Sequence, residues 1–267
     1  MPTPLEILLD PISLMIVVMY ATLMLWEAIA PARKLPIVKG WKVRALTAFV
    51  VFFYLSTYLP LLWNGYLAQH QLFDLSQFSI LSTTLIGLAV IELGIYIWHR
   101  TMHSSKLLWR MFHQMHHSAE RLDSYGAFYF SPLDMIGWTA LSSLCLTLLV
   151  GLPAQAATNV ILFTTFFAIF QHANINTPRW LGYFIQRPES HTVHHATDIH
   201  FNNFSDLPVF DILFGTFKNP KTYKHETGLF PGASAQIVDM LLMRDLQENS
   251  DVSTNNKNTI SAQNQIA

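Results

Sequence analysis

Histidine is the residue type in this chain whose number and spacing point to chemistry. Twelve of the 267 residues are histidines. Eight of them form three short clusters with helical spacing: His99 and His103, then His113, His116 and His117, then His191, His194 and His195. Residues three or four positions apart share one face of an α-helix, so each cluster is expected to aim its imidazoles at a common point. Neutral imidazole is the commonest metal ligand in proteins and suits iron, zinc, copper and nickel.

The number of clustered imidazoles predicts two metal ions. A single ion holds about four to six ligands, fewer than the clusters offer. His172 closes an apolar run and should reach the depth of the clusters, so we predict it as a ninth ligand. His200 is a weaker candidate, and His70 and His225 are expected to be ordinary surface histidines.

A stripe of polar residues leads to the first cluster. Glu92, Tyr96, His99 and His103 lie at offsets 0, 4, 7 and 11 along one helical face. An ionisable residue inside an apolar membrane helix is costly and indicates a function. We expect Glu92 and Tyr96 behind the metal site, where Glu92 could accept a ring N–H and fix the imidazole tautomer. The alternative is a hydrogen bond from Glu92 to a neighbouring helix.

The composition indicates a membrane protein. Hydrophobic residues make up 51% of the chain and charged residues 12%, whereas a soluble domain carries roughly twice that share of charge. Five apolar runs lie at about Ile12–Ala30, Val43–Trp63, Ile80–Trp98, Ile136–Leu152 and Ala154–Gln171. The first three can cross a bilayer core of about 30 Å, and the last two form either two crossings or a hairpin. We therefore expect an all-α, multi-pass membrane bundle of four to five hydrophobic helices with a cytoplasmic, histidine-rich helical cap.

Basic residues predict the orientation of these helices. They lie between the first and second runs, between the third and fourth, and after the fifth, and the other connections contain none. Because cytoplasmic loops are enriched in Lys and Arg, this asymmetry places the histidines in the cytoplasm and the N-terminus outside. The first run lacks a basic start and precedes Pro31, which favours a retained anchor over a signal peptide. The lack of a C-terminal K-D-E-L or dilysine address favours a bacterial inner membrane over the endoplasmic reticulum.

The order of the histidine clusters resembles that of the fatty acid hydroxylase/sterol desaturase superfamily. H-R-x-x-H at His99–His103 precedes H-x-x-H-H-S at His113–Ser118. The third cluster is followed by Asn203-Phe204 and by Asp211–Thr216, similar to that family's closing block. The resemblance covers about residues 80–217. It implies an integral-membrane, non-haem di-iron oxygenase whose nine histidines, with His172 among them, bind two irons, supported by Asn203 and Asp211.

Four positions or segments depart from the family pattern and put the substrate class in doubt. Glu92 stands where an aspartate is usual, and Tyr129–Pro132 replaces an Arg-x-His-Pro segment. The usual Asn-Tyr-Gly and Trp-Asp pairs read Asn203-Phe204-Ser205 and Phe210-Asp211. The lipid is therefore left open among sterols, fatty acyl chains, ether lipids and carotenoids.

The predicted reaction is O2-dependent hydroxylation or desaturation of a lipid C–H bond, with hydroxylation favoured. We expect zinc to be able to replace iron during purification. No dinucleotide fingerprint is present, and the single cysteine, Cys145, excludes a four-cysteine cluster, so a separate reductase, ferredoxin or cytochrome must supply electrons. The net charge of −1 gives no reason to expect nucleic acid as a partner.

Two other classes of function compete with this interpretation. A membrane zinc hydrolase would use similar ligands, but H-E-x-x-H is absent and the histidines outnumber a usual catalytic zinc set. A metal or proton transporter is a weaker alternative, because such proteins place ionisable residues near the bilayer midplane.

The chain is expected to divide into four parts. Residues 1–79 form membrane anchor helices, and residues 80–217 form the catalytic domain. Residues 218–246 form a cytoplasmic C-terminal segment, and residues 247–267 form an Asn-rich disordered tail.

Overall fold

The computed structural model describes residues 1–197, 199 and 201–247 of the chain. His200 and residues 248–267 of the predicted disordered tail lie outside the described residues. In the described part the fold is helical, with one isolated β-bridge between Ala196 and Thr227. The expected all-α class is therefore confirmed.

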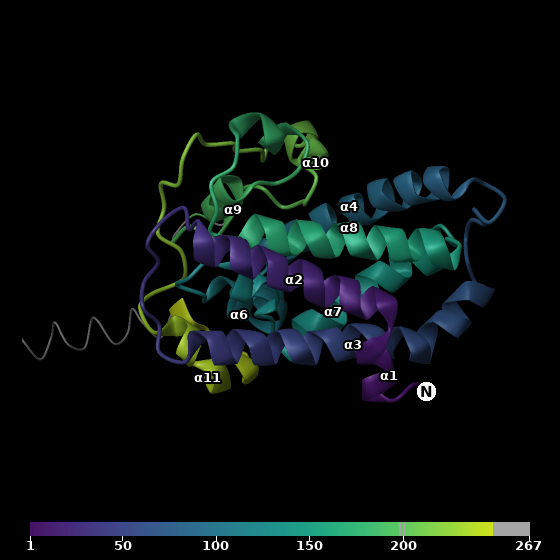
Figure 1. Cartoon of the computed structure of the whole chain (residues 1–267), viewed down its shortest axis with the longest axis horizontal. Helices are drawn as coiled ribbons and strands as arrows, with labels where there is room; N and C mark the ends of the chain where they lie inside the picture. The colour runs from purple at the N-terminus through teal and green to yellow at the C-terminus, as the bar shows by residue number, and fades with distance from the viewer. Residues whose placement is uncertain (198, 200, 248–267) are drawn as a thin grey trace, which may run out of the picture.

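Five long apolar helices form a bundle (Figure 1). They are α2 (Pro11–Ile29), α3 (Trp41–Gln69), α4 (Ile80–Ser104), α7 (Pro132–Ser143) continued by the π-helix η3 (Leu144–Leu149), and α8 (Ala154–His172). All five are long and apolar enough to cross a membrane, so both of the last two runs have the length for a crossing. The chain is accordingly an integral membrane protein.

Local sequence signals explain where these helices begin. The side chains of Asp10, Ser79 and Ser131 cap the first turns of α2, α4 and α7 by accepting backbone N–H groups. Proline follows the cap in α2 and α7, where its missing N–H costs nothing. Most side chains of α2 and α3 are not buried within the protein, as expected for helices that face lipid.

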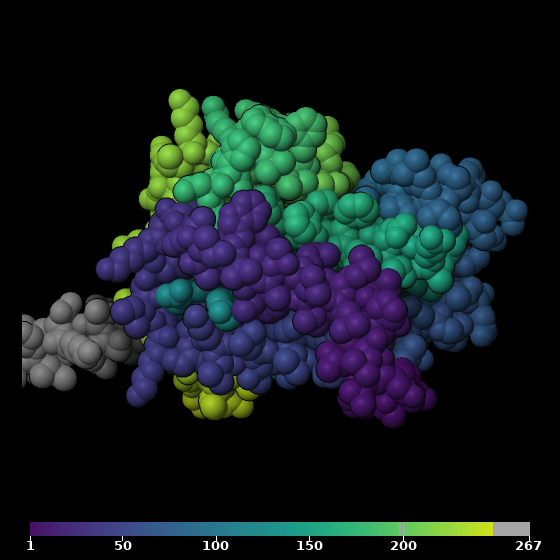
Figure 2. Space-filling view, viewed as in Figure 1, coloured from purple at the N-terminus to yellow at the C-terminus, as the bar shows by residue number. Residues whose placement is uncertain are grey.

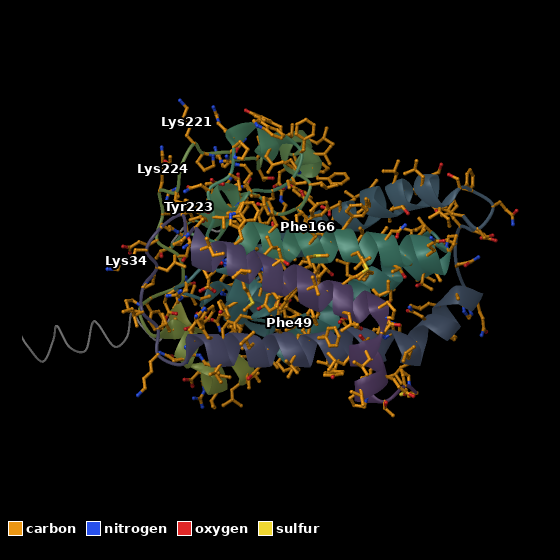
Figure 3. The ribbon with its side chains drawn as sticks, in the orientation of Figure 1. Lys34, Phe49, Phe166, Lys221, Tyr223 and Lys224 are labelled. Atoms are coloured by element: carbon orange, nitrogen blue, oxygen red, sulfur yellow. The ribbon has the colours of Figure 1, made fainter. Side chains whose placement is uncertain are left out.

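The direction of the helices brings one set of ends together. α2, α4 and α8 end on the side where α3 and α7 begin, so His99, His103 and His172 lie at the same end of the bundle. Figure 3 shows Lys34, Lys221 and Lys224 at this end, while Phe49 and Phe166 lie along the bundle. The connections at the opposite end, residues 70–79 and 150–153, contain no Lys or Arg.

Short helices cap the histidine end of the bundle (Figure 1), and in the space-filling view the green and yellow-green surface of the C-terminal segments lies at this end (Figure 2). They are α5 (Lys106–Leu108), the π-helix η1 (Trp109–His113), α6 (Gln114–His117), η2 (Ser124–Phe128), η4 (Arg179–Tyr183), α9 (Pro188–His194), α10 (Val209–Leu213), η5 (Ala233–Ala235) and α11 (Ile237–Leu241). At the opposite end α1 (Pro4–Leu9) precedes α2 and is tied to α3, because the hydroxyls of Tyr54 and Tyr58 donate to the carbonyls of Pro4 and Pro2.

Buried polar side chains fasten the N-terminal helices to the cap. One Glu27 carboxylate oxygen on α2 accepts hydrogen bonds from Ser124 N and Oγ, both at 2.8 Å, and from Asn174 N at 3.1 Å. Trp41 Nε1, at the start of α3, donates to Asp123 at 2.9 Å. Buried charge-assisted hydrogen bonds of this kind are strong, so the predicted anchor helices are an integral part of the structure around the histidines.

Candidate metal centre

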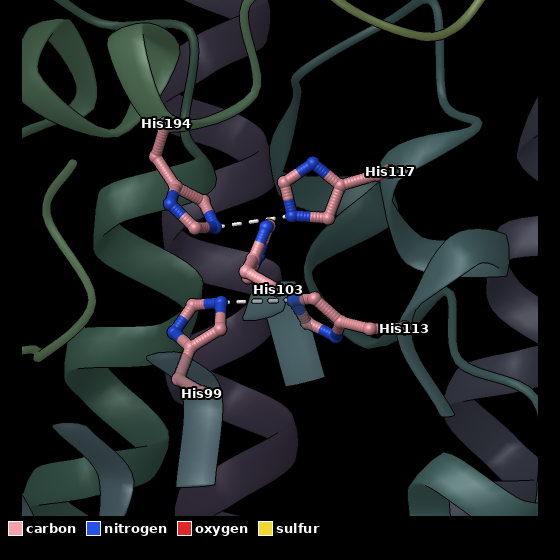
Figure 4. A group of neighbouring side chains, drawn as sticks. All are labelled: His99, His103, His113, His117 and His194. Atoms are coloured by element: carbon pink, nitrogen blue, oxygen red, sulfur yellow. Dashed lines mark hydrogen bonds between the residues drawn. The ribbon is translucent and has the colours of Figure 1, made fainter. Parts of the chain in front are cut away.

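Nine histidines converge in two adjacent groups at the cap end of the bundle. In each group the candidate ligand nitrogens all lie within 4.8 Å of one another. The five-histidine group, drawn in Figure 4, consists of His99, His103, His113, His117 and His194. The four-histidine group consists of His116, His172, His191 and His195. These are the nine residues predicted as ligands, whereas His70, which is exposed, and His225 belong to neither group.

Each H-x-x-H-H cluster divides between the two groups, so the expectation that a cluster aims at one common point is wrong. His113 and His117 belong to the five-histidine group and His116 to the other. In the same way His191 and His195 join the four-histidine group while His194 joins the five-histidine group. At 3.6 residues per turn, side chains at i+3 and i+4 diverge by about 100°, too far for both to meet one ion. A single helix therefore supplies both groups.

The spacing of the ring nitrogens fits metal ligation. His99 Nε2 lies 2.8 Å from His113 Nε2, and His117 Nε2 lies 3.0 Å from His194 Nε2 (Figure 4). In the four-histidine group, His172 Nε2 lies 3.1 Å from both His116 Nε2 and His191 Nε2. His195 Nε2 lies 3.1 Å from His191 Nε2. Nitrogens bound to one ion at about 2.0–2.1 Å and at right angles to one another lie about 2.9 Å apart. The residues present thus match the donor set that a metal ion requires.

Hydrogen bonds at the outer ring nitrogens fix several tautomers. Nδ1 of His99 lies 2.7 Å from the carbonyl oxygen of Phe204, and Nδ1 of His194 lies 2.8 Å from that of Asn202. Nδ1 of His172 lies 2.6 Å from the carbonyl oxygen of Ala168. Because a carbonyl only accepts, each Nδ1 must carry the proton, which leaves the Nε2 lone pair directed at the centre of the group.

Burial keeps the histidines of the cap neutral. Desolvation lowers the pKa of His113, His116 and His117 well below the ordinary value, and neighbouring histidines lower it further. The pKa values of His191 and His195 are lowered for the same two reasons. A neutral imidazole is the form that binds a metal, so the site needs no deprotonation near neutral pH.

Asp211 and Asn203 organise the loop that carries the Phe204 and Asn202 carbonyls. The Asp211 carboxylate accepts hydrogen bonds from Phe204 N at 2.8 Å, Ser205 N at 2.9 Å and Thr216 Oγ1 at 2.6 Å. Asn203 adopts a positive φ of 59°, and its amide nitrogen donates to the carbonyl of Ser190 at 2.8 Å. These two residues act on the ligands through the backbone.

Glu92 and Tyr96 lie near the site without the expected contact to a ring. Glu92 is fully buried, and its Oε2 atom accepts a hydrogen bond from Leu207 N at 2.9 Å. It therefore binds the loop of residues 201–207, called the closing loop below, instead of an imidazole. Tyr96 Oη accepts a hydrogen bond from Arg100 at 2.8 Å, and its ring stacks on Phe214 at 5.0 Å. A carbonyl oxygen, that of Phe204, takes the place that the sequence suggested for the Glu92 carboxylate.

Asp134 is the acidic residue beside the ligands that the sequence reading missed. It is fully buried in the first turn of α7, and its Oδ2 atom lies 3.4 Å from His113 Nδ1. Glu92 was singled out because it lies inside an apolar run, whereas Asp134 lies just before the run that begins at Ile136 and so did not meet that criterion. Its hydroxylated neighbour Ser131 caps α7, so the start of that helix positions the carboxylate.

A cavity of about 670 Å³ extends from the histidines through the bundle toward α1. At the cap end its wall includes five of the nine candidate ligands: His99, His113, His116, His172 and His191. Further along, the wall is formed largely by aromatic and aliphatic side chains such as Phe49, Phe53, Ile91 and Ile95. A cavity of this size and lining is suited to a molecule with a long apolar part.

Comparison with known proteins links this arrangement to one family. Residues 84–216, which contain all nine candidate ligands, match the model of the family described as fatty acid hydroxylase. No solved structure shows a significant match.

The relatives of this chain include named lipid hydroxylases. It is 32% identical over 158 residues to an ornithine lipid hydroxylase, OlsE, of Rhizobium tropici, covering 58% of this chain and 47% of that protein. It is 28% identical to sphinganine C4-monooxygenase 2 of Arabidopsis thaliana, covering 58% of this chain and 62% of the relative. It is also 28% identical to the sphingolipid C4-hydroxylase sur2 of Schizosaccharomyces pombe, covering 50% and 47%. The matched segments thus span about half to three fifths of these relatives.

Proposed function

Because the chain belongs to the fatty acid hydroxylase family, we propose that it is a membrane-bound di-iron oxygenase that hydroxylates a C–H bond of a lipid. The observation that carries the proposal is the convergence of nine imidazoles, in two groups, at one end of a largely apolar cavity inside a membrane bundle. The three relatives named above are hydroxylases or monooxygenases by name, which favours hydroxylation over desaturation.

The proposed reaction converts R–H, O2, two electrons and two protons into R–OH and water. The five-histidine and four-histidine groups would each hold one iron, and the two ions would supply the activation of O2. The protein's own contribution is to hold the imidazoles on rigid helices with their Nε2 lone pairs inward, and to enclose the lipid chain in a cavity that excludes water. The histidines that line the cavity place the reacting carbon beside the ions.

Electrons and substrate must reach the site from opposite directions. The described residues contain no dinucleotide-binding fingerprint, which supports a separate reductase, ferredoxin or cytochrome as the donor. Such a donor would approach the cap, which we place in the cytoplasm because the Lys and Arg residues of the connections gather there. The lipid would reach the cavity from the bilayer. A bacterial inner membrane is the location we favour.

The test combines metal analysis with isotope labelling. Protein purified without oxygen should contain close to two irons per chain, and membranes supplied with 18O2 should yield a lipid one labelled oxygen heavier. Loss of two hydrogens without added oxygen would indicate desaturation instead. Tightly bound zinc, with product oxygen derived from water, would contradict the proposal and favour a hydrolase.

A further inference from the structure

We propose that the lipid substrate carries an amine, and that its ammonium group pairs with Asp206 at the cap end of the cavity. The inference rests on the proposed function, because it specifies which lipid the same cavity accepts. It assigns the polar end of the substrate to the histidine end of the cavity and the hydrocarbon part to the apolar remainder.

Asp206 lies in the cavity wall, and one of its two carboxylate oxygens accepts a hydrogen bond from the protein. It lines the cavity together with His172 and His191, and its exposed fraction is 7%. Its Oδ1 atom accepts a hydrogen bond from Gln171 Nε2 at 2.8 Å, and Gln171 in turn accepts one from Gln186 Nε2 at 2.7 Å. Oδ2 receives no hydrogen bond from any residue that the structure describes. The side chain is therefore held in place while one oxygen lacks a protein donor.

A second buried carboxyl group increases the demand for a cation. Glu92 on α4 interacts electrostatically with Asp206, and its Oε1 atom lacks a hydrogen-bond partner. Asp211 on α10 adds a further negative charge, although its carboxylate is occupied by Phe204, Ser205 and Thr216. Among the described residues, neither Glu92 nor Asp206 forms an ion pair with Lys or Arg. A buried carboxyl group either keeps its proton or pairs with a cation, and a substrate cation can supply the ion pair that Asp206 lacks within the protein.

The electrostatics agree with this reading of the geometry. Burial raises the pKa of Asp206 to about 7, and the hydrogen bond from Gln171 only partly offsets that effect. Near neutral pH the carboxyl group is thus poised to lose its proton when a positive charge arrives beside it. An ammonium group on the substrate supplies that charge.

Among the described residues, the rest of the cavity wall offers no second buried carboxylate to the ammonium group, and its one buried side-chain oxygen without a partner, Asn64 Oδ1, is uncharged. The wall is mainly apolar, and hydroxyls along it are used within their own helices, as when Thr57 donates to the carbonyl of Phe53 at 2.9 Å. The two acids at the opposite end, Glu6 and Asp10, are exposed and cap the turns of α1 and α2. A substrate bound through Asp206 would be oxidised within a few bonds of its nitrogen, and one bound through Asp10 would be oxidised far along its chain.

The experiment compares two probes that differ only in the head group. Octadecylamine and octadecanol are titrated, without oxygen, into the iron-loaded protein in detergent, and binding is followed by tryptophan fluorescence. The wild type should prefer the amine by roughly 10–100-fold, the range expected for a charge-assisted hydrogen bond. Asp206→Asn should lose most of that preference while binding the alcohol as before. Asp206→Glu, which keeps the charge, should retain part of the preference for the amine.

Asp10→Asn is the matched control, because asparagine preserves the helix cap and removes a charge at the other end of the cavity. It should leave the preference unchanged. Equal binding of the two probes by the wild type, or an unchanged preference in Asp206→Asn, would overturn the inference. Loss of iron from Asp206→Asn would also overturn it, since the carboxylate would then serve the metals. Oxygen incorporation from 18O2 is a separate measurement, so a failure of the proposed function is distinguishable from a failure of amine recognition.

Discussion

The two histidine groups differ in how they meet the cavity. In the five-histidine group, His99 and His113 line the cavity, and the other three rings do not. In the four-histidine group, His116, His172 and His191 line it and only His195 does not. With fewer protein ligands and more of them on the cavity wall, the four-histidine group leaves more room for O2 and substrate. The comparison suggests that the smaller group is the one nearer the reacting carbon.

The groups also differ in what holds their rings. In the five-histidine group, Asp134 and the Phe204 and Asn202 carbonyls lie at outer nitrogens, and each comes from outside the helix that carries the ring. The His172 ring is held by Ala168, one turn earlier in its own helix. A substitution that disturbs the closing loop should therefore misorient rings of the five-histidine group before those of the four-histidine group.

The largest expected effect comes from removing a ligand of the smaller group. His172→Ala leaves that group with three imidazoles and should reduce lipid hydroxylation by more than about 100-fold, beyond what outer-shell substitutions cause. Iron should fall from two to at most one per chain, measured by mass spectrometry of the metal. His103→Ala, which leaves four imidazoles in the larger group, should lose less iron. Equal losses in the two variants would remove the distinction between the groups.

Asp211→Asn should be the next most damaging change. It weakens a buried carboxylate that accepts hydrogen bonds from Phe204, Ser205 and Thr216, and should lower the free energy of unfolding by about 3 kcal/mol. Thermal unfolding and metal content measure the two consequences. Asp239→Asn is the control, because its ion pair with Arg244 is exposed and is worth at most about 1 kcal/mol. If Asp211→Asn lowers stability without loosening iron, the loop does not position the larger group.

Asp134→Asn should affect the larger group alone. Its carboxylate oxygen lies 3.4 Å from His113 Nδ1, and loss of such a partner weakens metal binding by roughly 10–100-fold. A chelator titration that resolves two iron populations would show one weakened and the other unchanged. Weakening of both populations, or of neither, would contradict a role confined to the five-histidine group.

The smallest effect is that of pH on protein stripped of metal. The pKa values of His113, His116, His117, His191 and His195 are lowered by burial, so below about pH 6.5 the unfolded chain binds more protons than the folded one. Stability is then full above that pH and declines progressively as the pH falls from it. Melting temperatures between pH 8 and 5 should drop for the metal-free protein. A flat profile would indicate that the rings are accessible to water.

Much of the fold and the ligand set could be predicted from the sequence because the signals are local. Long apolar runs specify membrane helices, and histidine spacing indicated eight of the nine rings that the structure brings together, while His172 was indicated by its place at the end of an apolar run. The assignment of each ring to a group could not be predicted, because it depends on how α6 and α9 approach α4 and α8. The partner of His99 is a backbone carbonyl, that of Phe204, and a carbonyl carries no sequence signal. Asp134 was missed because it lies just before an apolar run and not inside one.

The sharing of α6 and α9 between the two groups has a consequence for assembly with iron. Both helices lend rings to each group, so the first ion to arrive immobilises side chains that the second ion needs. α4 and α8, by contrast, each carry ligands of one group, so a substitution that shifts α6 or α9 should disturb both ions whereas a shift of α4 or α8 should first disturb one.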